Sequence, residues 1–330
     1  MSVTIASRPR ADFVETPYIA ELSERGLGYL GAGFGLNLEG HAGSGKTTLA
    51  FHIASKLARP IVLVSGDDSM ESEDLVGRMG GFRRRKLVDN FIHSVLKVEE
   101  EGSDSWIDER LTIACREGYT LIYDEFTRSR AEANNVLLPV LEEGVLVMPS
   151  SAGGGYVRVH PEFRAIFTSN PEDYAGVHRA QEALRDRMVT IELGAVDFDT
   201  ELAIVSRKSA LSSAEVTPIV SIVRAAHHAG MGKSQGSIRT SLQIAKVAAV
   251  RKLPIRADNP TFKQVIFDVL GNSLIHDNKT RRRRQALEEL IDKYIYVEPE
   301  GSSYPKERHG YSQNDDEASE PGSKVLGSAH

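Results

Sequence analysis

A phosphate-binding loop constrains the fold of this chain more than any other feature of the sequence. The stretch LEGHAGSGKTTLA, residues 38–50, contains the pattern G-x-x-x-x-G-K-[ST]. Its glycines permit backbone angles that let several N–H groups point inward at a β-phosphate. We expect Lys46 to reach the β- and γ-phosphates of a nucleotide and the Thr47 hydroxyl to bind Mg²⁺.

The residues on both sides of the loop support this interpretation. GLNLEG, residues 35–40, is typical of a short buried strand, and residues 46–58 predict a helix whose leucine and isoleucine residues share one face. The N-terminus of that helix adds a partial positive charge to the site. The residues expected to contact the nucleotide are Gly40, His41, Ala42, Gly43, Ser44, Gly45, Lys46, Thr47 and Thr48.

Five runs rich in β-branched and other apolar residues are typical of strands covered on both faces. Helical segments separate them, which predicts an open five-stranded parallel sheet with helices on both faces. From Ala195 to Tyr296 helical periodicity dominates, so a small all-helical domain is expected to follow the sheet. The expected strands are GLNLEG, RPIVLVSG, YTLIYDE, FRAIFTSN and RMVTIEL.

The chain is therefore expected to have four parts. The last of them is a tail rich in Ser, Gly, Asp, Glu and Pro, a composition that favours disorder. The parts are a flexible arm (1–16), an α/β nucleotide-binding domain (17–194), a helical lid domain (195–296) and a disordered tail (297–330).

Two insertions interrupt the α/β domain. The first, at about residues 71–104, contains GGFRRRK at residues 80–86, for which we expect a partner-contacting loop, with a solvated turn as the alternative. It precedes an amphipathic helix that is expected to start near Ser105. The second insertion, at about residues 144–160, predicts a β-hairpin around a turn rich in Gly and Ser.

Composition excludes several classes of protein. The 40 Lys and Arg residues against 46 Asp and Glu residues give a net charge of −6, so neither nucleic acid nor a membrane is expected as a partner. RRRR at residues 281–284 is interpreted as a solvated face. The single cysteine, Cys115, excludes an internal disulfide and a multi-cysteine metal site. Because no stretch has the length of a signal peptide's apolar run or a membrane span, we expect a soluble cytoplasmic protein.

Two strand ends carry the groups that nucleotide hydrolysis needs. LIYDEF places Asp124 where it would hold the water shell of Mg²⁺, and Glu125 where it would polarise the attacking water. Asn170 ends IFTSN on a neighbouring strand and would orient the same water. Ligands of such sheets collect at the carboxyl ends of the strands, where Lys46 would also lie. The alternative role for the two carboxylates is to cap the following helix.

Three arginines are candidates for stabilising the charge that develops on the transferred phosphoryl group. Arg185 and Arg187 precede the fifth strand in EALRDRM, and Arg239 starts a helix of the second domain in GSIRTSL. One arginine from the lid and one from a neighbouring subunit would meet this need. A solvated surface position is the alternative for each of them, and Arg128 is a further candidate.

These motifs together resemble those of AAA+ ATPases. GHAGSGKTT, LIYDEFTRSR, IFTSN, LRDRM and SIR are similar to the two Walker motifs, the first sensor, the arginine finger and the second sensor of that class. EDLVG and the hairpin before the first sensor resemble the MoxR branch. DEFTRSRAEANNVLLPVLEEG and FTSNPEDYAGVH look like the gas vesicle protein N family, and the resemblance covers roughly residues 16–296.

The resemblance implies a role for each matching residue. Asp124 takes the position of the metal ligand together with Thr47, and Glu125 that of the catalytic glutamate. Asn170 matches the first sensor. The remaining matches are the arginine finger at Arg187, with Arg185 close enough to leave that assignment open, and the second sensor at Arg239, where SIR lacks a proline common in MoxR relatives.

The resemblance also implies a function. Such proteins are ring-forming, here expected to be hexameric homo-oligomers that use ATP and Mg²⁺ to remodel proteins, with nucleotide held between subunits. The expected partners are gas vesicle structural or accessory proteins, and the chain would associate with gas vesicles. Alternatives are a MoxR-like chaperone that matures a metalloenzyme or activates a carbon-fixing enzyme, and a nucleotide-dependent scaffold with little turnover. A small-molecule kinase is disfavoured because the sequence has no acceptor-site signature.

Overall fold

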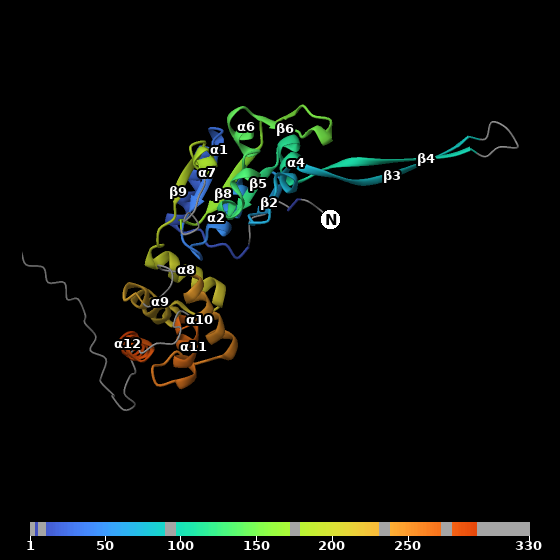
Figure 1. The fold of residues 1–330 in the computed structure, drawn as a ribbon. Helices are drawn as coiled ribbons and strands as arrows, with labels where there is room; N and C mark the ends of the chain where they lie inside the picture. Colours follow the sequence, from blue (N-terminus) through green and yellow to red (C-terminus); the bar gives the residue numbers. More distant parts are fainter. Residues whose placement is uncertain are drawn as a thin grey trace, which may run out of the picture. The chain divides into compact units, whose positions relative to one another are not determined.

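A parallel sheet organises the first part of the chain (Figure 1). The computed structural model describes residues 4–5, 11–89, 97–171, 179–230, 238–271 and 279–295, and within them the five-stranded sheet has the order β2-β5-β8-β1-β9. All its neighbouring strands are parallel. The predicted α/β fold is confirmed, with strands β1 (Gly35–Glu39), β2 (Ile61–Ser65), β5 (Thr120–Asp124), β8 (Arg164–Ser169) and β9 (Met188–Glu192).

Alternate residues of each strand enter two separate apolar cores, because successive side chains of a strand point to opposite faces. Leu36 and Leu38 of β1 pack with α1 (Pro17–Gly31) and α2 (Lys46–Lys56) on one face. Tyr123 and Phe167 lie in the core of the other face. The helices that contribute to this second core are α3 (Ser72–Val76), α4 (Arg110–Glu117), α6 (Leu137–Glu142) and α7 (Arg179–Arg185).

The single cysteine belongs to the second core. Cys115 on α4 is fully buried, and burial raises the pKa of its thiol to about 12. Two single-turn 3₁₀ segments and one short helix complete this part of the chain: η1 (Phe126–Arg128), α5 (Ala131–Asn134) and η2 (Ser150–Ala152).

A helical region follows the sheet, as predicted. Its own core contains Ile222, Phe262 and Ile266, all fully buried. Asp197 caps the first helix by accepting a hydrogen bond from the Thr200 N–H (2.8 Å). No helix among the described residues combines the length and the apolar character needed to cross a bilayer. The helices are α8 (Phe198–Ser209), α9 (Ser213–His228), α10 (Ile238–Arg251), α11 (Pro260–Gly271) and α12 (Lys279–Tyr294).

The insertions are both antiparallel strand pairs, and the first differs from the expectation. GGFRRRK lies on β3 (Gly77–Asp89), which pairs with β4 (Lys97–Asp108), so the expected loop is a strand. In the register of this pair Arg85 lies opposite Glu101. In the second insertion β6 (Val145–Val147) pairs with β7 (Tyr156–Arg158), which is the expected hairpin.

The helix expected to start near Ser105 starts at Arg110 instead. Residues 105–108 belong to β4, because they pair with the first residues of β3. Trp106 and Ile107 fit an apolar helix face and an extended strand equally well, so periodicity alone did not locate this boundary. The tail at 297–330, expected to be disordered, lies outside the described residues.

We predict that Phe167→Ala lowers the free energy of unfolding by about 3–5 kcal/mol, because it leaves a cavity in a packed core. The Phe167 ring is fully buried and lies 5.4 Å from the Phe126 ring and 6.2 Å from the Tyr123 ring. Chemical denaturation measures the change. The control is Val250→Ala at a position that is 83% exposed, where a change within about 0.5 kcal/mol is expected; equal losses for both variants would contradict this description of the core.

Candidate functional site

The predicted phosphate loop connects β1 to α2 with the expected geometry. Gly45, immediately before α2, has a φ of 95°, a conformation that favours glycine. A Cβ atom at Gly40 would lie 2.8 Å from the Leu193 carbonyl oxygen, so the loop passes too close to β9's end for a side chain. Lys46 is 8% exposed, and its Nζ donates to the carbonyl oxygens of Gly40 (2.6 Å) and His41 (2.9 Å). The lysine therefore lies folded over the loop that is expected to hold phosphates.

Three oxygen-bearing side chains meet beside the loop. The Thr47 hydroxyl donates to Asp124 Oδ1 (2.7 Å), and so does the Thr168 hydroxyl (2.6 Å). Thr168 Oγ1 also accepts a hydrogen bond from the backbone N–H of Glu125 (2.8 Å). Sequence reasoning missed Thr168, although its position in IFTSN, on a strand next to β5, was a usable signal. It connects β8 to both acidic residues at the end of β5.

Glu125 adopts an unusual backbone conformation at the end of β5. Its φ is 52°, in the left-handed region that few non-glycine residues occupy. Its carbonyl oxygen lies against Gly66, where a Cβ atom would approach to 2.1 Å. The carboxylate pairs with Arg128 Nη1 at 2.7 Å, and both side chains are about half exposed. A strained backbone therefore presents the predicted catalytic carboxylate, which an arginine three residues later contacts.

The other predicted residues fall in different surroundings. Asn170 directly follows β8 and is half-buried, next to the strand end that carries Asp124. Arg187 Nε donates to Glu142 Oε2 (2.7 Å) at the end of α6. Arg185 Nη2 donates to Glu39 Oε2 (3.0 Å) at the end of β1. Arg239, on α10, is exposed.

A cavity of about 330 Å³, which we call the loop cavity, adjoins the phosphate loop. Nine of the predicted residues line it: Ala42, Gly43, Ser44, Gly45, Lys46, Thr47, Thr48, Glu125 and Arg239. Its other wall is apolar. The apolar lining residues are Phe13, Val14, Tyr18, Ile19, Leu22, Leu49, Leu193, Val196, Ile204, Ile238 and Leu242.

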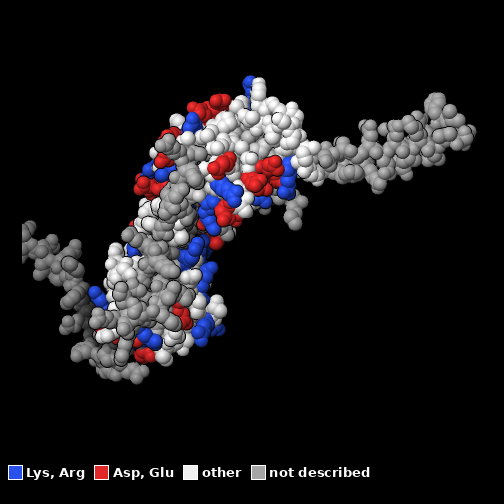
Figure 2. All heavy atoms as spheres, viewed as in Figure 1, with Lys and Arg blue, Asp and Glu red and all other residues white. Residues whose placement is uncertain are grey.

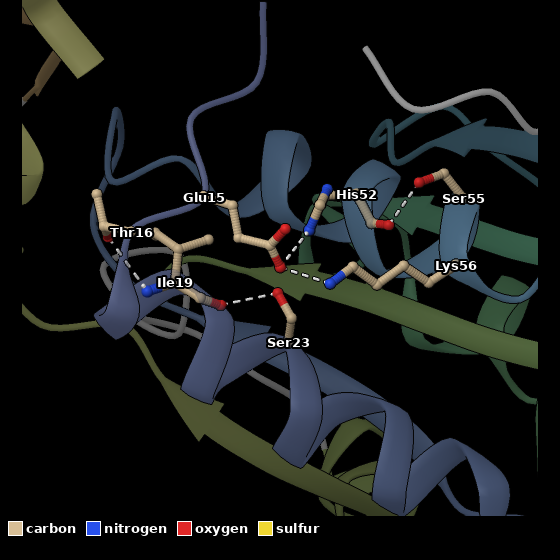
Figure 3. Close-up of polar contacts among 7 residues, drawn as sticks. All are labelled: Glu15, Thr16, Ile19, Ser23, His52, Ser55 and Lys56. Carbon is tan, nitrogen blue, oxygen red and sulfur yellow. Dashed lines mark hydrogen bonds and ion pairs between the residues drawn. The ribbon is translucent and has the colours of Figure 1, made fainter. Parts of the chain in front are cut away.

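The segment before α1 supplies part of this apolar wall. The Phe13 ring stacks on the His52 ring of α2, with 3.8 Å between centroids and 9° between planes. Figure 3 shows the Glu15 carboxylate between His52 and Lys56; its Oε1 lies 3.3 Å from His52 Nε2 and forms an ion pair with Lys56 Nζ. The backbone of Ile5 also pairs with Ile61 of β2. Ile5, Phe13 and Glu15, from the segment expected to be a flexible arm (1–16), thus contact the α/β domain.

Burial and hydrogen bonding shift the pKa values of His52 and Glu15. The side chain of His52 is 7% exposed, and burial lowers its pKa below 6.5 despite the opposing effect of the Glu15 carboxylate. The hydrogen bond from Lys56 is the main cause of a lowered pKa of Glu15. His52 is therefore neutral in the folded chain at neutral pH. Protonation of His52 therefore lowers the free energy of unfolding.

The lowered pKa of His52 predicts a loss of stability in acid. Because the unfolded chain binds more protons below pH 6.5, the stability that His52 contributes is present above that pH and is lost as the pH falls. Between about pH 7.5 and about pH 5.5, the parent chain should lose more unfolding free energy than His52→Gln, by at most about 1.4 kcal/mol per pH unit. Denaturant titrations at each pH measure the free energy of unfolding of the two proteins. His228→Gln, at an exposed position, should follow the parent; a parent-like His52→Gln profile would refute the assignment.

The chain is similar in sequence to known proteins. Residues 35–188 match the family described as "AAA domain (dynein-related subfamily)". The chain is 47% identical over 296 residues to "Gas vesicle ATPase GvpN" of Ancylobacter aquaticus, covering 88% of this chain and 83% of the relative. It is 37% identical over 282 residues to "Gas vesicle ATPase GvpN1" of Halobacterium salinarum, covering 85% and 80%. It is 26% identical over 216 residues to "Protein CbbQ" of Hydrogenophilus thermoluteolus, covering 65% and 73%.

Proposed function

The chain belongs to the gas vesicle ATPase GvpN family of AAA-domain proteins and hydrolyses ATP, and on that premise we propose that it is an oligomeric machine that remodels proteins during gas vesicle assembly. The observation that carries the proposal is the set of hydrogen bonds joining Thr47, Asp124, Thr168 and Glu125 beside the loop cavity. These contacts support the proposal, because they join the residues proposed to bind the nucleotide to the residue proposed to cleave it.

In this proposal the loop cavity holds ATP. The phosphates lie along residues 40–48 at the N-terminus of α2, whose N-cap residue Gly45 offers the helix no side-chain acceptor. The base lies against the apolar wall that Phe13 and Tyr18 help to form. Lys46 exchanges its two carbonyl acceptors for phosphate oxygens.

Thr47 and Asp124 are the proposed holders of Mg²⁺. Their oxygen atoms are hard donors 2.7 Å apart, and a hydroxyl with one carboxylate suits an ion that keeps several waters and binds substrate phosphates. When bound, the ion would neutralise charge on the β- and γ-phosphates. Thr168 would hold the Asp124 carboxylate in place when the Thr47 and Asp124 oxygens turn from each other to the ion.

Glu125 and Asn170 are proposed to act on the attacking water. Glu125 lines the loop cavity, and its carboxylate must leave Arg128 before it polarises a water molecule. Asn170, at the end of the adjacent strand β8, would orient that water through its amide. Arg239 lines the cavity from α10 and is the proposed lid contact to the phosphates.

Arg187 is proposed to act across a subunit interface in a ring, which we expect to be hexameric. Its guanidinium binds Glu142 of α6 and the Ala183 carbonyl oxygen rather than the residues beside the loop cavity. Arg185 and Arg128 pair with Glu39 and Glu125, which keeps both near their own chain's phosphate loop. These contacts favour Arg187 over Arg185 and Arg128 for the proposed finger role.

Gas vesicle structural or accessory proteins are the proposed partners, and we expect the chain to associate with gas vesicles. The β6–β7 hairpin offers an apolar contact, since the register partners Val147 and Tyr156 are 58% and 66% exposed. Figure 2 shows few charged side chains over β6, whereas charges of both signs mix elsewhere on that face. The alternative of a MoxR-like chaperone for a metalloenzyme or carbon-fixing enzyme fits the similarity to Protein CbbQ, which is weaker, at 26% against 47% identity.

The proposed site predicts separate effects on binding and on turnover. Lys46→Ala should weaken nucleotide binding, because it removes a charge from the phosphates. Glu125→Gln should keep binding and abolish turnover, because it changes only the group that polarises water. Equilibrium titration with ADP and steady-state ATP hydrolysis measure the two effects. Parent-like hydrolysis by Glu125→Gln would rule out the role of Glu125.

A site completed between subunits predicts complementation in mixtures. An arginine supplied by a neighbour changes turnover by about 10³–10⁵ in other nucleotidases, so Arg187→Ala should be nearly inactive while it still binds nucleotide. Lys46→Ala should also be inactive. Mixing the two should restore part of the activity, because some interfaces pair an intact loop with an intact arginine.

The measurement is ATP hydrolysis across mixing ratios, with oligomer size followed in parallel. Mixed oligomers that form but restore no activity at any ratio would show that Arg187 does not act in trans. Arg185 or Arg128 would then become the candidate.

A further inference from the structure

A carboxylate lies next to the first residue of the phosphate loop. Glu39 ends β1 and precedes Gly40, and its side chain is 12% exposed. In the register of the sheet it lies between Ser169 of β8 and Glu192 of β9. A negative charge at this strand end disfavours a triphosphate on the adjacent loop unless a cation compensates it.

Arg185 supplies such a cation from α7. Its Nη2 lies 3.0 Å from Glu39 Oε2, and its side chain is 37% exposed, so the pair is shielded mainly on the carboxylate's side. The two residues are 146 positions apart in the sequence. Arg185 therefore connects the helix that ends beside Arg187 to the strand that carries the phosphate loop.

A buried polar chain holds Glu39 in this position. The Ser169 hydroxyl donates to Asn37 Oδ1 (3.1 Å) and lies 3.4 Å from Glu39 Oε2. Asn37 Nδ2 in turn donates to Thr190 Oγ1 (3.3 Å) on β9. Asn37 and Ser169 are fully buried. Three adjacent strands thereby fix the carboxylate that Arg185 contacts.

Glu39 also lines a second cavity, of about 270 Å³, which we call the Glu39 cavity. Five residues line both this cavity and the loop cavity: Ser44, Leu193, Gly194, Val196 and Ile238. Pro171, the residue after Asn170, also lines the Glu39 cavity. The carboxylate is thus adjacent to the phosphate loop on one side and to the predicted first sensor on the other.

We propose that Arg185 is a positioning residue for ATP that acts through Glu39 within its own subunit. It compensates the charge of Glu39 beside the phosphate loop and keeps α7 attached to that strand end. The proposal rests on the nucleotide site proposed above. The proposal gives the two arginines of LRDRM different roles, since Arg185 contacts Glu39 and Arg187 contacts Glu142.

The test compares Arg185→Ala, Glu39→Gln and the double variant in the full chain. Arg185→Ala should weaken binding of a non-hydrolysable ATP analogue on the order of tenfold, because the cation that contacts the Glu39 carboxylate beside the phosphate loop is removed. ADP, with one phosphate fewer, should be affected less. The KM for ATP should rise while kcat is largely kept, whereas Arg187→Ala should lower kcat and keep binding.

Glu39→Gln in the Arg185→Ala background should restore binding, since it removes the uncompensated charge. Arg185→Lys should also retain binding because it keeps a cation. The matched control is Arg256→Ala, an arginine paired with the exposed Asp258, which should leave ATP binding unchanged.

Several results would overturn the proposal. Parent-like ATP binding by Arg185→Ala would do so, and so would a double variant that binds as weakly as Arg185→Ala. If Arg185→Ala does not fold, Glu39→Gln alone decides: parent-like or tighter binding of the ATP analogue supports the proposal, and weaker binding contradicts it. Lys46→Ala separates the two levels, because its unchanged ATP binding would refute the nucleotide site itself.

Discussion

The parallel register of β5, β8 and β1 is the constraint on which the site depends. That register sets Tyr123 opposite Phe167, so that the next residues, Asp124 and Thr168, meet at the sheet's carboxyl edge. Because the side-chain period of a strand is two residues, a slip of one residue would exchange the faces of Thr168 and Phe167, which would take Phe167 out of the second core and Thr168 away from Asp124. The same apolar burial that stabilises the sheet therefore fixes the hydrogen bonds of the site. Thr168 takes part in two of these hydrogen bonds, since its hydroxyl donates to the side chain of Asp124 and accepts from the backbone N–H of Glu125.

The fold and the phosphate loop were predictable because their signals are local. The loop pattern spans a few residues, and each strand is a short apolar run between helical segments. Contacts between distant residues gave no such signal. Glu39 and Arg185 are 146 residues apart, and nothing near either residue identifies the other. Likewise, the charged stretch on β3 was expected to be a loop, because its partners on β4 become apparent only when the strands pair.

The segment before α1 illustrates the same limit and shows why it matters. Its residues carry no periodicity, yet Phe13 stacks on His52 of α2 and forms part of the loop cavity. Three residues later, Thr16 Oγ1 lies 2.7 Å from Thr200 Oγ1 on α8. One segment therefore touches the helix that follows the phosphate loop, the cavity and the helical region. The nucleotide proposed to fill the cavity would therefore contact a wall to which both parts of the chain contribute.

Arg128, Arg185 and Arg187 each have an acidic partner, and the exposure of each pair bears on the proposed role of the arginine. Arg128–Glu125 and Arg187–Glu142 are substantially exposed, and such ion pairs contribute about 0–1 kcal/mol, so exchanging their partners is inexpensive. Under the proposed roles both ion pairs must break. Glu125 must leave Arg128 to contact the attacking water, and Arg187 must leave Glu142 to reach the nucleotide of a neighbouring subunit. Arg185–Glu39 differs because its carboxylate is largely buried and tied to Ser169. Removing one partner there leaves a poorly solvated charge, which is far less favourable than losing an exposed pair. Burial of the acidic partner thus distinguishes the three pairs: Arg128 and Arg187, whose partner carboxylates are exposed, are suited to change partners during turnover, and Arg185 is suited to stay.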